Sequence, residues 1–170
     1  MSPAGFFSTF GALLVCFSWP LFAQEVVSSD KENFKVEVLA EGLSNPWAVA
    51  ELPDGRLLVT ERSGALRIIE GGRLLEAKVA GLPPVFAQGQ GGLLDVELHP
   101  DYASNGWLYL SFSDPRGDRA TTKIIRGRLK DMVLVDQEVL FQAPDADYFK
   151  GGVHFGCRIT FDHKGFFYFG

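Results

Sequence analysis

The sequence predicts an all-β protein built as a β-propeller, and three observations support this prediction. Short runs of apolar, aromatic and β-branched residues alternate with turns rich in Gly and Pro, as in strands joined by tight turns. A unit of strand, Pro- or Asp-containing corner, Gly and second strand recurs at about 40 to 50 residues, which is typical of propeller blades. No window shows an apolar stripe with the period and length of a helix. A plain antiparallel sandwich also uses many short strands, but the recurrence favours the propeller.

The composition is that of a soluble globular domain. The 170 residues are 46% hydrophobic and carry a net charge of −5. A nucleic-acid surface needs clustered Lys and Arg to neutralise phosphates, so this modest acidity argues against a nucleic-acid partner.

The first 23 residues contain no Asp, Glu, Lys or Arg. A short apolar run, Phe10–Phe17, is followed by a break at Pro20 and by a small residue, Ala23, before the chain turns polar. This pattern predicts a signal peptide over residues 1–23 and a periplasmic or secreted protein with no stable membrane insertion after cleavage. Two alternatives stay open: an uncleaved anchor, in which Pro20 would interrupt a span of about 20 apolar residues, and lipoprotein processing at Cys16.

The sequence has two cysteines, Cys16 and Cys157. Removal of the signal peptide would leave Cys157 alone, so the mature chain would have no intrachain disulfide. We expect Cys157 to act as a small buried hydrophobe.

The predicted elements begin after a polar spacer over residues 24–33. Residues 34–38 alternate apolar and polar side chains, as a half-buried strand does. A first blade follows, with its first two strands joined by the turn Pro53-Asp54-Gly55, in which Pro sets φ and Gly accepts positive φ. Its strands are expected at Pro46–Leu52, Leu57–Thr60 and Ala65–Ile69.

The same plan repeats further along the chain. A second blade is expected at Gly91–Leu98, Trp107–Phe112, Thr122–Leu129 and Val133–Phe141, and a third opens with Arg158–Phe161 and Phe166–Phe169. Residues 34–170 would therefore form a partial propeller of two to three blades, whereas a closed ring needs about 4 to 8. Because the chain ends on an aromatic strand that nothing would cover, we expect it to be a piece of a longer protein.

Two glycine-rich segments carry polar side chains at equivalent places before a blade's first strand. In Gln88–Gly92, the Gln90 amide is suited to hydrogen-bond sugar hydroxyls, although a turn that needs positive φ is the commoner explanation of such a motif. In Lys150–Arg158, His154 has the side chain best matched to accept a proton near neutral pH. A lone His beside glycines is more often a structural hydrogen-bonding residue. In a propeller, both segments would surround one end of the central channel.

Other chemistries find little support in the sequence. Three scattered His residues and one retained Cys do not give zinc spacing, so no metal ligands are predicted. Asp101 and Asp162 lie in predicted turns, where hydrogen bonds to the backbone explain them without calcium. Neither a phosphate-binding loop nor a Gly-x-Ser-x-Gly elbow is present. His99 and His163 are expected in turns or at the surface.

Four segments together resemble the soluble glucose/sorbosone dehydrogenases that use pyrroloquinoline quinone (PQQ), particularly their periplasmic aldose sugar dehydrogenase branch. The matching stretches are Gly42–Trp47 with Leu52–Gly55, Gly89–Asp95, His99–Tyr102 and His154–Phe161. The resemblance covers 36–170 and implies a six-bladed β-propeller. It also implies oxidation of aldose sugars to lactones with PQQ and calcium; the physiological electron acceptor stays unknown.

The resemblance implies roles for three residues. His154 falls on the general base, which takes the proton of the anomeric hydroxyl while hydride passes to PQQ. Gln90 falls on a polar residue that lines the pocket for sugar and cofactor, and Arg158 on an Arg with a supporting role. The cofactor carries the redox chemistry, and the protein supplies base, orientation and electrostatics.

The sequence departs from the family pattern at two positions. Cys157 stands where a second Gly is usual, and Val153 replaces the Asp or Asn expected before the base. Most residues that hold PQQ and calcium in the family belong to later blades. We therefore expect the full-length protein to be an oxidoreductase and this 170-residue chain alone to be inactive.

Two other functions remain open at this stage. A non-catalytic propeller that binds carbohydrate or protein would keep the scaffold without the redox chemistry. A calcium-dependent lactonase would need acidic ligands at the channel, where the sequence offers only amides and one His.

Overall fold

The structure is a computed structural model that describes residues 26–28, 30–156, 158–162 and 164–170. The signal peptide predicted over residues 1–23 lies outside the described residues, as do Cys157 and His163. The chain divides into two compact units, Met1–Glu37 and Val38–Gly170, and each is described by itself. Within the described residues, no helix is both long and apolar enough to cross a membrane.

The first unit contains a short antiparallel hairpin. Strand β1 (Val26–Ser28) pairs with β2 (Asn33–Lys35). Strand β1 lies within the segment predicted as a polar spacer. The half-buried strand expected over residues 34–38 is shorter than predicted, and its side chains are exposed, with Phe34 at 50% exposure. The alternation of side chains correctly indicated a strand but not its burial.

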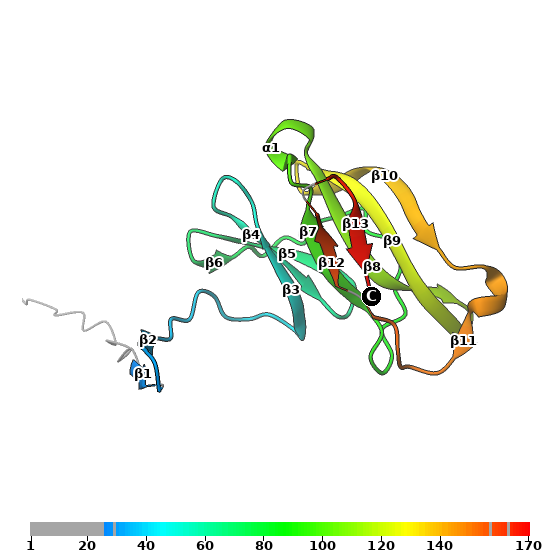
Figure 1. Ribbon diagram of the computed structural model, residues 1–170, viewed down its shortest axis with the longest axis horizontal. Helices are drawn as coiled ribbons and strands as arrows, with labels where there is room; N and C mark the ends of the chain where they lie inside the picture. Colours follow the sequence, from blue (N-terminus) through cyan, green and yellow to red (C-terminus); the bar gives the residue numbers. More distant parts are fainter. Residues whose placement is uncertain (1–25, 29, 157, 163) are drawn as a thin grey trace, which may run out of the picture. The chain divides into compact units, whose positions relative to one another are not determined.

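The second unit begins with a four-stranded antiparallel sheet in the order β3-β4-β5-β6 (Figure 1). The strands are β3 (Pro46–Glu51), β4 (Leu57–Glu61), β5 (Ala65–Glu70) and β6 (Arg73–Leu74). The predicted Pro53-Asp54-Gly55 turn joins β3 to β4, and the Leu52 N–H donates to the Arg56 carbonyl across it (2.8 Å). The predicted first blade is thereby confirmed.

The next sheet is also antiparallel, with the order β10-β9-β8-β7 and a short β11 added beside β9. Its members are β7 (Leu93–Leu98), β8 (Trp107–Arg116), β9 (Arg119–Lys130), β10 (Val133–Gln142) and β11 (Phe149–Lys150). One helical turn, α1 (Tyr102–Asn105), joins β7 to β8, and a 3-10 turn (Asp145–Asp147) precedes β11. The predicted second blade is confirmed, and the insert before its successor contains β11.

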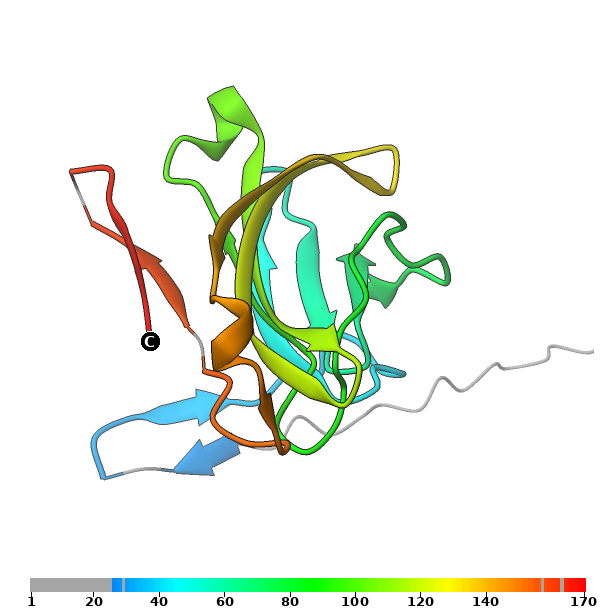
Figure 2. The same cartoon turned by 90° about the vertical axis from the view of Figure 1, so that its right-hand side faces the viewer.

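A third, two-stranded hairpin closes the described chain. Its strands are β12 (Ile159–Phe161) and β13 (Phe167–Phe169), where the third blade was predicted to open. Figure 2 shows the hairpin on the side of the second sheet opposite the first sheet.

Side chains of strand β8 alternate between two cores, because successive residues of a strand point to opposite faces. Leu108, Leu110 and Phe112 are fully buried in the core shared with the first sheet. Tyr109 faces the other way and packs with Ile159 in the core shared with the third hairpin. Two apolar faces on one sheet are what stacked propeller blades require, and the all-β partial propeller is confirmed.

His99, expected in a turn or at the surface, contacts this second core. Its ring stacks on Tyr109 with centroids 6.2 Å apart and meets the Phe161 ring edge-on at 5.5 Å. The side chain is therefore a structural contact between the second sheet and the third hairpin.

Candidate functional site

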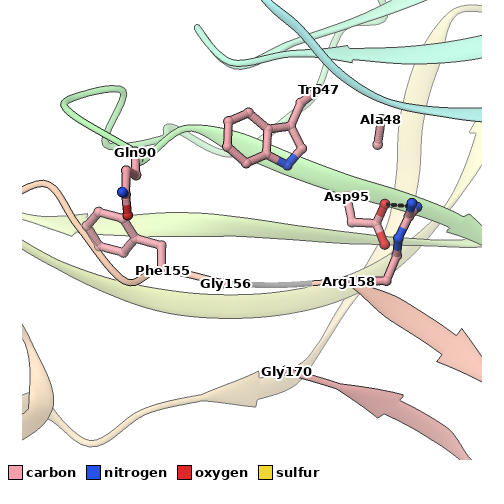
Figure 3. A pocket seen from close by; sticks show the side chains of 8 residues that line it. All are labelled: Trp47, Ala48, Gln90, Asp95, Phe155, Gly156, Arg158 and Gly170. Atoms are coloured by element: carbon pink, nitrogen blue, oxygen red, sulfur yellow. Dashed lines mark hydrogen bonds and ion pairs between the residues drawn. The ribbon is translucent and has the colours of Figure 1, made fainter.

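A pocket of about 460 Å³ opens where the first strands of the three sheets meet. Strand β7 lies against β3 of the first sheet and against β12 of the third hairpin. In Figure 3, Gln90 and Phe155 lie at one end of the pocket, and Asp95 and Arg158 lie at the other. The lining residues are Trp47, Ala48, Gln90, Asp95, Phe155, Gly156, Arg158 and Gly170.

The loop that carries Gln90 touches the segment before His154 through its backbone. The Gln90 N–H donates to the Gly152 carbonyl at 2.5 Å. Gly89 adopts φ 57°, and a Cβ built there would lie 2.8 Å from the Gly152 Cα. Only glycine allows this approach, so the motif needs glycine both for the turn and for the contact.

The structure brings Gln90 and His154 together. The His154 backbone N–H donates to the Gln90 Oε1 at 2.9 Å, which leaves the amide nitrogen of Gln90 directed elsewhere. His154 adopts φ 62°, a left-handed conformation that few residues other than glycine adopt. Its side chain is exposed and, among the described residues, is not one that lines the pocket. The contact between the two predicted residues is therefore made by the His154 backbone.

Phe155 fixes the segment that follows His154. It is 2% exposed, and its ring packs against Phe86 (6.1 Å) and Phe149 (5.4 Å). The Phe155 carbonyl accepts a hydrogen bond from the Thr122 hydroxyl of β9. An apolar anchor and a hydrogen bond thus hold this end of the loop against the second sheet.

Arg158, the third predicted site residue, pairs with Asp95 at the other end of the pocket. The Arg158 Nη1 lies 3.2 Å from the Asp95 Oδ1, as Figure 3 shows. The Arg158 side chain is 75% exposed, whereas that of Asp95 is 3% exposed. The guanidinium therefore belongs to the pocket wall, and the carboxylate lies beneath it.

A second carboxyl group lies on the same strand. Burial raises the pKa of the Glu97 carboxyl, the nearby Asp95 charge raises it further, and Arg158 opposes these two effects. Glu97 is half-buried, and its ionised form is less stable there than in water.

Asp95 and Trp47 were assigned no role from the sequence, although both belong to the segments that carry the family resemblance. Trp47 is 51% exposed and presents its indole to the pocket (Figure 3). The signal for Asp95 was an acidic residue inside the apolar strand Leu93–Leu98, since a carboxylate is rarely buried without a partner. An exposed Trp at the start of a strand gives no comparable signal.

The expectation that this end of the channel offers only amides and one His was wrong, because Asp95 lines the pocket. Both of its oxygens are engaged, by Arg158 and by the Ile159 N–H. In the described part of the chain, no three His, Cys, Asp or Glu residues lie close enough together to hold a metal ion.

Comparison with protein families gives one match that covers most of the chain. The family described as glucose/sorbosone dehydrogenase matches residues 43–170. These residues include the three sheets of the second unit and every residue that lines the pocket.

A curated relative and two solved structures are similar to this chain. Aldose sugar dehydrogenase YliI of Escherichia coli (strain K12) is 41% identical over 160 residues, which cover 91% of this chain and 41% of the relative. The crystal structure of the soluble aldose sugar dehydrogenase from Escherichia coli in the apo-form has 42% identity and a TM-score of 0.71, and the match covers 77% of this chain and 38% of that one. The PQQ-bound aldose sugar dehydrogenase from Streptomyces coelicolor has 28% identity and a TM-score of 0.66, covering 78% and 39%. The chain therefore spans about two fifths of the length of these proteins.

Proposed function

This chain belongs to the glucose/sorbosone dehydrogenase family, and on that premise we propose that the full-length protein oxidises aldose sugars to lactones with PQQ as the electron acceptor. Members of this family are sugar dehydrogenases, so the chain belongs to an oxidoreductase family, and we propose an aldose as the sugar. The observation that supports it most is the pocket where Gln90, Arg158 and the His154 loop converge.

His154 is proposed as the general base, because an imidazole accepts a proton near neutral pH. It would take the proton of the anomeric hydroxyl as the C1–H bond breaks, leaving a C1=O double bond in the lactone. The quinone, when bound, supplies the acceptor for the hydrogen and electron pair that leave C1.

Gln90 and Arg158 would orient the substrate around this base. The Gln90 Oε1 already accepts from the His154 backbone, so its amide N–H₂ is the group offered to a sugar hydroxyl. The Arg158 side chain is mostly exposed and offers a positive charge at the other end of the pocket. Trp47 adds an aromatic surface between these two polar ends.

The residues present are chemically suited to part of the quinone. PQQ is a planar aromatic ring system with carboxylates, and the pocket offers the Trp47 indole and the Arg158 guanidinium. For calcium, the resemblance to the family is the support, and we propose that its ligands belong to residues of the full-length protein beyond this chain.

A non-catalytic propeller that binds carbohydrate or protein is the second candidate. Two observations favour it: Val153 is 44% exposed and has no polar atom for the base or the sugar, and His154 is not among the described residues that line the pocket. Under this reading, the pocket would bind a sugar without oxidising it.

The localisation proposed is periplasmic or secreted, after removal of a signal peptide over residues 1–23. The apolar leader of the sequence supports this assignment. Amino-terminal sequencing of the exported protein checks it, with Gln24 expected as the first residue.

The test is reconstitution of the full-length protein with PQQ and calcium, followed by dye reduction with an aldose and chromatography of the product. We expect quinone-dependent turnover that yields the lactone, and no turnover from the 170-residue chain alone. Binding of the sugar without any turnover by the loaded full-length protein would favour the second candidate.

A further inference from the structure

Asp95 is a buried charge on strand β7 of the second sheet, where it lines the pocket. Its side chain is 3% exposed, and its backbone N–H donates to the Ser111 Oγ of the neighbouring strand (3.0 Å). Removing a carboxylate from water costs several kcal/mol in effective terms unless partners replace its hydration. The partners of Asp95 therefore show what this charge stabilises.

The two partners of the carboxylate are Ile159, the first residue of β12, and Arg158, which directly precedes it. The Asp95 Oδ2 accepts from the Ile159 backbone N–H at 2.7 Å, and Oδ1 pairs with the Arg158 Nη1 at 3.2 Å. Ile159 is 1% exposed and packs in the core between the second sheet and the third hairpin. One side chain thus fixes the point at which the loop ends and the next sheet begins.

The loop between the two sheets is consequently held at both ends. At its first end, the His154 N–H donates to Gln90, and Phe155 is buried. At its second end, Asp95 holds both Arg158 and Ile159. Three residues separate His154 from Arg158, the first residue bound by Asp95, so a shift at the second end is transmitted to His154 along a short stretch of backbone.

We propose that Asp95 is the positioning residue of this site: its carboxylate sets where the His154–Arg158 loop lies and how Arg158 faces the pocket. The expected effect of Asp95 on kcat rests on the proposed function. The position of the loop is argued only from the contacts of Asp95 with Arg158 and Ile159.

The same chemistry occurs once more in the first sheet and provides a matched control. The Glu61 carboxylate, 1% exposed, accepts from the Ser44 N–H at 2.7 Å and pairs with the Arg67 Nη1 at 3.2 Å. Glu61→Gln therefore removes a buried charge whose partners are of the same kind, a backbone N–H and an arginine, although Arg67 is 10% exposed where Arg158 is 75% exposed. Neither partner belongs to the His154–Arg158 loop.

The first experiment measures hydrogen exchange of the full-length protein carrying Asp95→Asn or Glu61→Gln. We expect Asp95→Asn to speed the exchange of the hydrogen-bonded amides of His154, Arg158 and Ile159 by about ten- to a hundredfold, the range that follows from losing one charge-assisted hydrogen bond. Glu61→Gln should leave these amides at the wild-type rate. Equal protection of this segment in wild type and Asp95→Asn would overturn the proposal, whether or not the protein oxidises sugars.

The second experiment measures kcat and KM of the quinone-loaded full-length protein. Displacement of the loop should lower kcat of Asp95→Asn by at least about tenfold, because small misplacements of a reacting group slow the chemical step. A purely structural role would lower the thermal midpoint of Asp95→Asn and Glu61→Gln alike and leave kcat intact in both.

The double variant Asp95→Asn/Arg158→Gln tests whether Asp95 affects the site through Arg158 or independently of it. If Asp95 acts on the site through Arg158, the double variant loses no more kcat than the more damaging single variant. Additive losses would contradict that link. Absence of aldose oxidation by the wild-type protein would refute the proposed function, and the exchange experiment would still decide on Asp95.

Discussion

Replacing Gly89 by alanine tests whether the two loops of the pocket touch as closely as the structure shows. Gly89 has φ 57°, and an added Cβ would lie 2.8 Å from the Gly152 Cα, with further backbone atoms of Gly152 within 3.0 Å. Backbone cannot rotate away as a flexible side chain does, so the two segments must separate. The hydrogen bond from the Gln90 N–H to the Gly152 carbonyl would be lost with that movement.

A matched control separates the effect of the contact with Gly152 from the effect of the positive φ at Gly89. Gly117 has φ 62°, and a Cβ there would meet no atom within 4 Å. Gly117→Ala should cost only the left-handed backbone conformation, about 1–2 kcal/mol. Gly89→Ala should cost that amount and about 1–3 kcal/mol more for the overpacked contact.

The assay is guanidinium unfolding of the full-length protein, followed by quinone-dependent aldose oxidation of each variant while folded. We expect a larger loss of stability for Gly89→Ala than for Gly117→Ala, and a lower kcat only for Gly89→Ala. Equal stability losses with equal kcat would refute the close approach of Gly89 and Gly152.

Two further predictions concern stability. Burial and the Asp95 charge raise the pKa of Glu97 above its value in the unfolded chain. Between these two pKa values the folded protein binds more protons than the unfolded chain, so the protein loses stability as the pH rises through that range. Glu97→Gln should therefore stabilise the protein more at about pH 7 than at about pH 4 in denaturant titrations, and a pH-independent effect would contradict this sign. Thr60 is fully buried, and its hydroxyl donates to the Leu94 carbonyl of the second sheet at 2.6 Å. Thr60→Val should lower the free energy of unfolding by about 1–3 kcal/mol, whereas Thr60→Ser should retain most of it, and equal losses would exclude this hydrogen bond as the cause.

The strands could be predicted from sequence because their signals are local. The Pro53-Asp54-Gly55 turn and the alternating runs beside it specify a hairpin without reference to the rest of the chain. The exposed β2 shows the limit, since alternation predicts a strand and its register but not which element covers it. The recurrence of the unit, rather than any single strand, distinguished stacked blades from a sandwich.

The site could be predicted only in part for the same reason. The glycine-rich motifs pointed to Gln90 and His154, and the structure joins them by a hydrogen bond. The Asp95–Arg158 pair and the approach of Gly89 to Gly152 depend on how two sheets stack. Residues more than 60 positions apart meet there, and no local pattern in one sequence records such a pairing.

His154 is the residue that we propose as the base for aldose oxidation. The most direct measurement compares kcat of the quinone-loaded full-length protein in wild type, His154→Ala and His99→Ala, with and without added imidazole. We expect a loss of kcat of about 10²–10⁴-fold for His154→Ala, partial recovery with imidazole, and wild-type kcat for His99→Ala, whose ring packs in the core beside Phe161. A His154→Ala protein that oxidises the aldose at the wild-type rate would contradict this proposal.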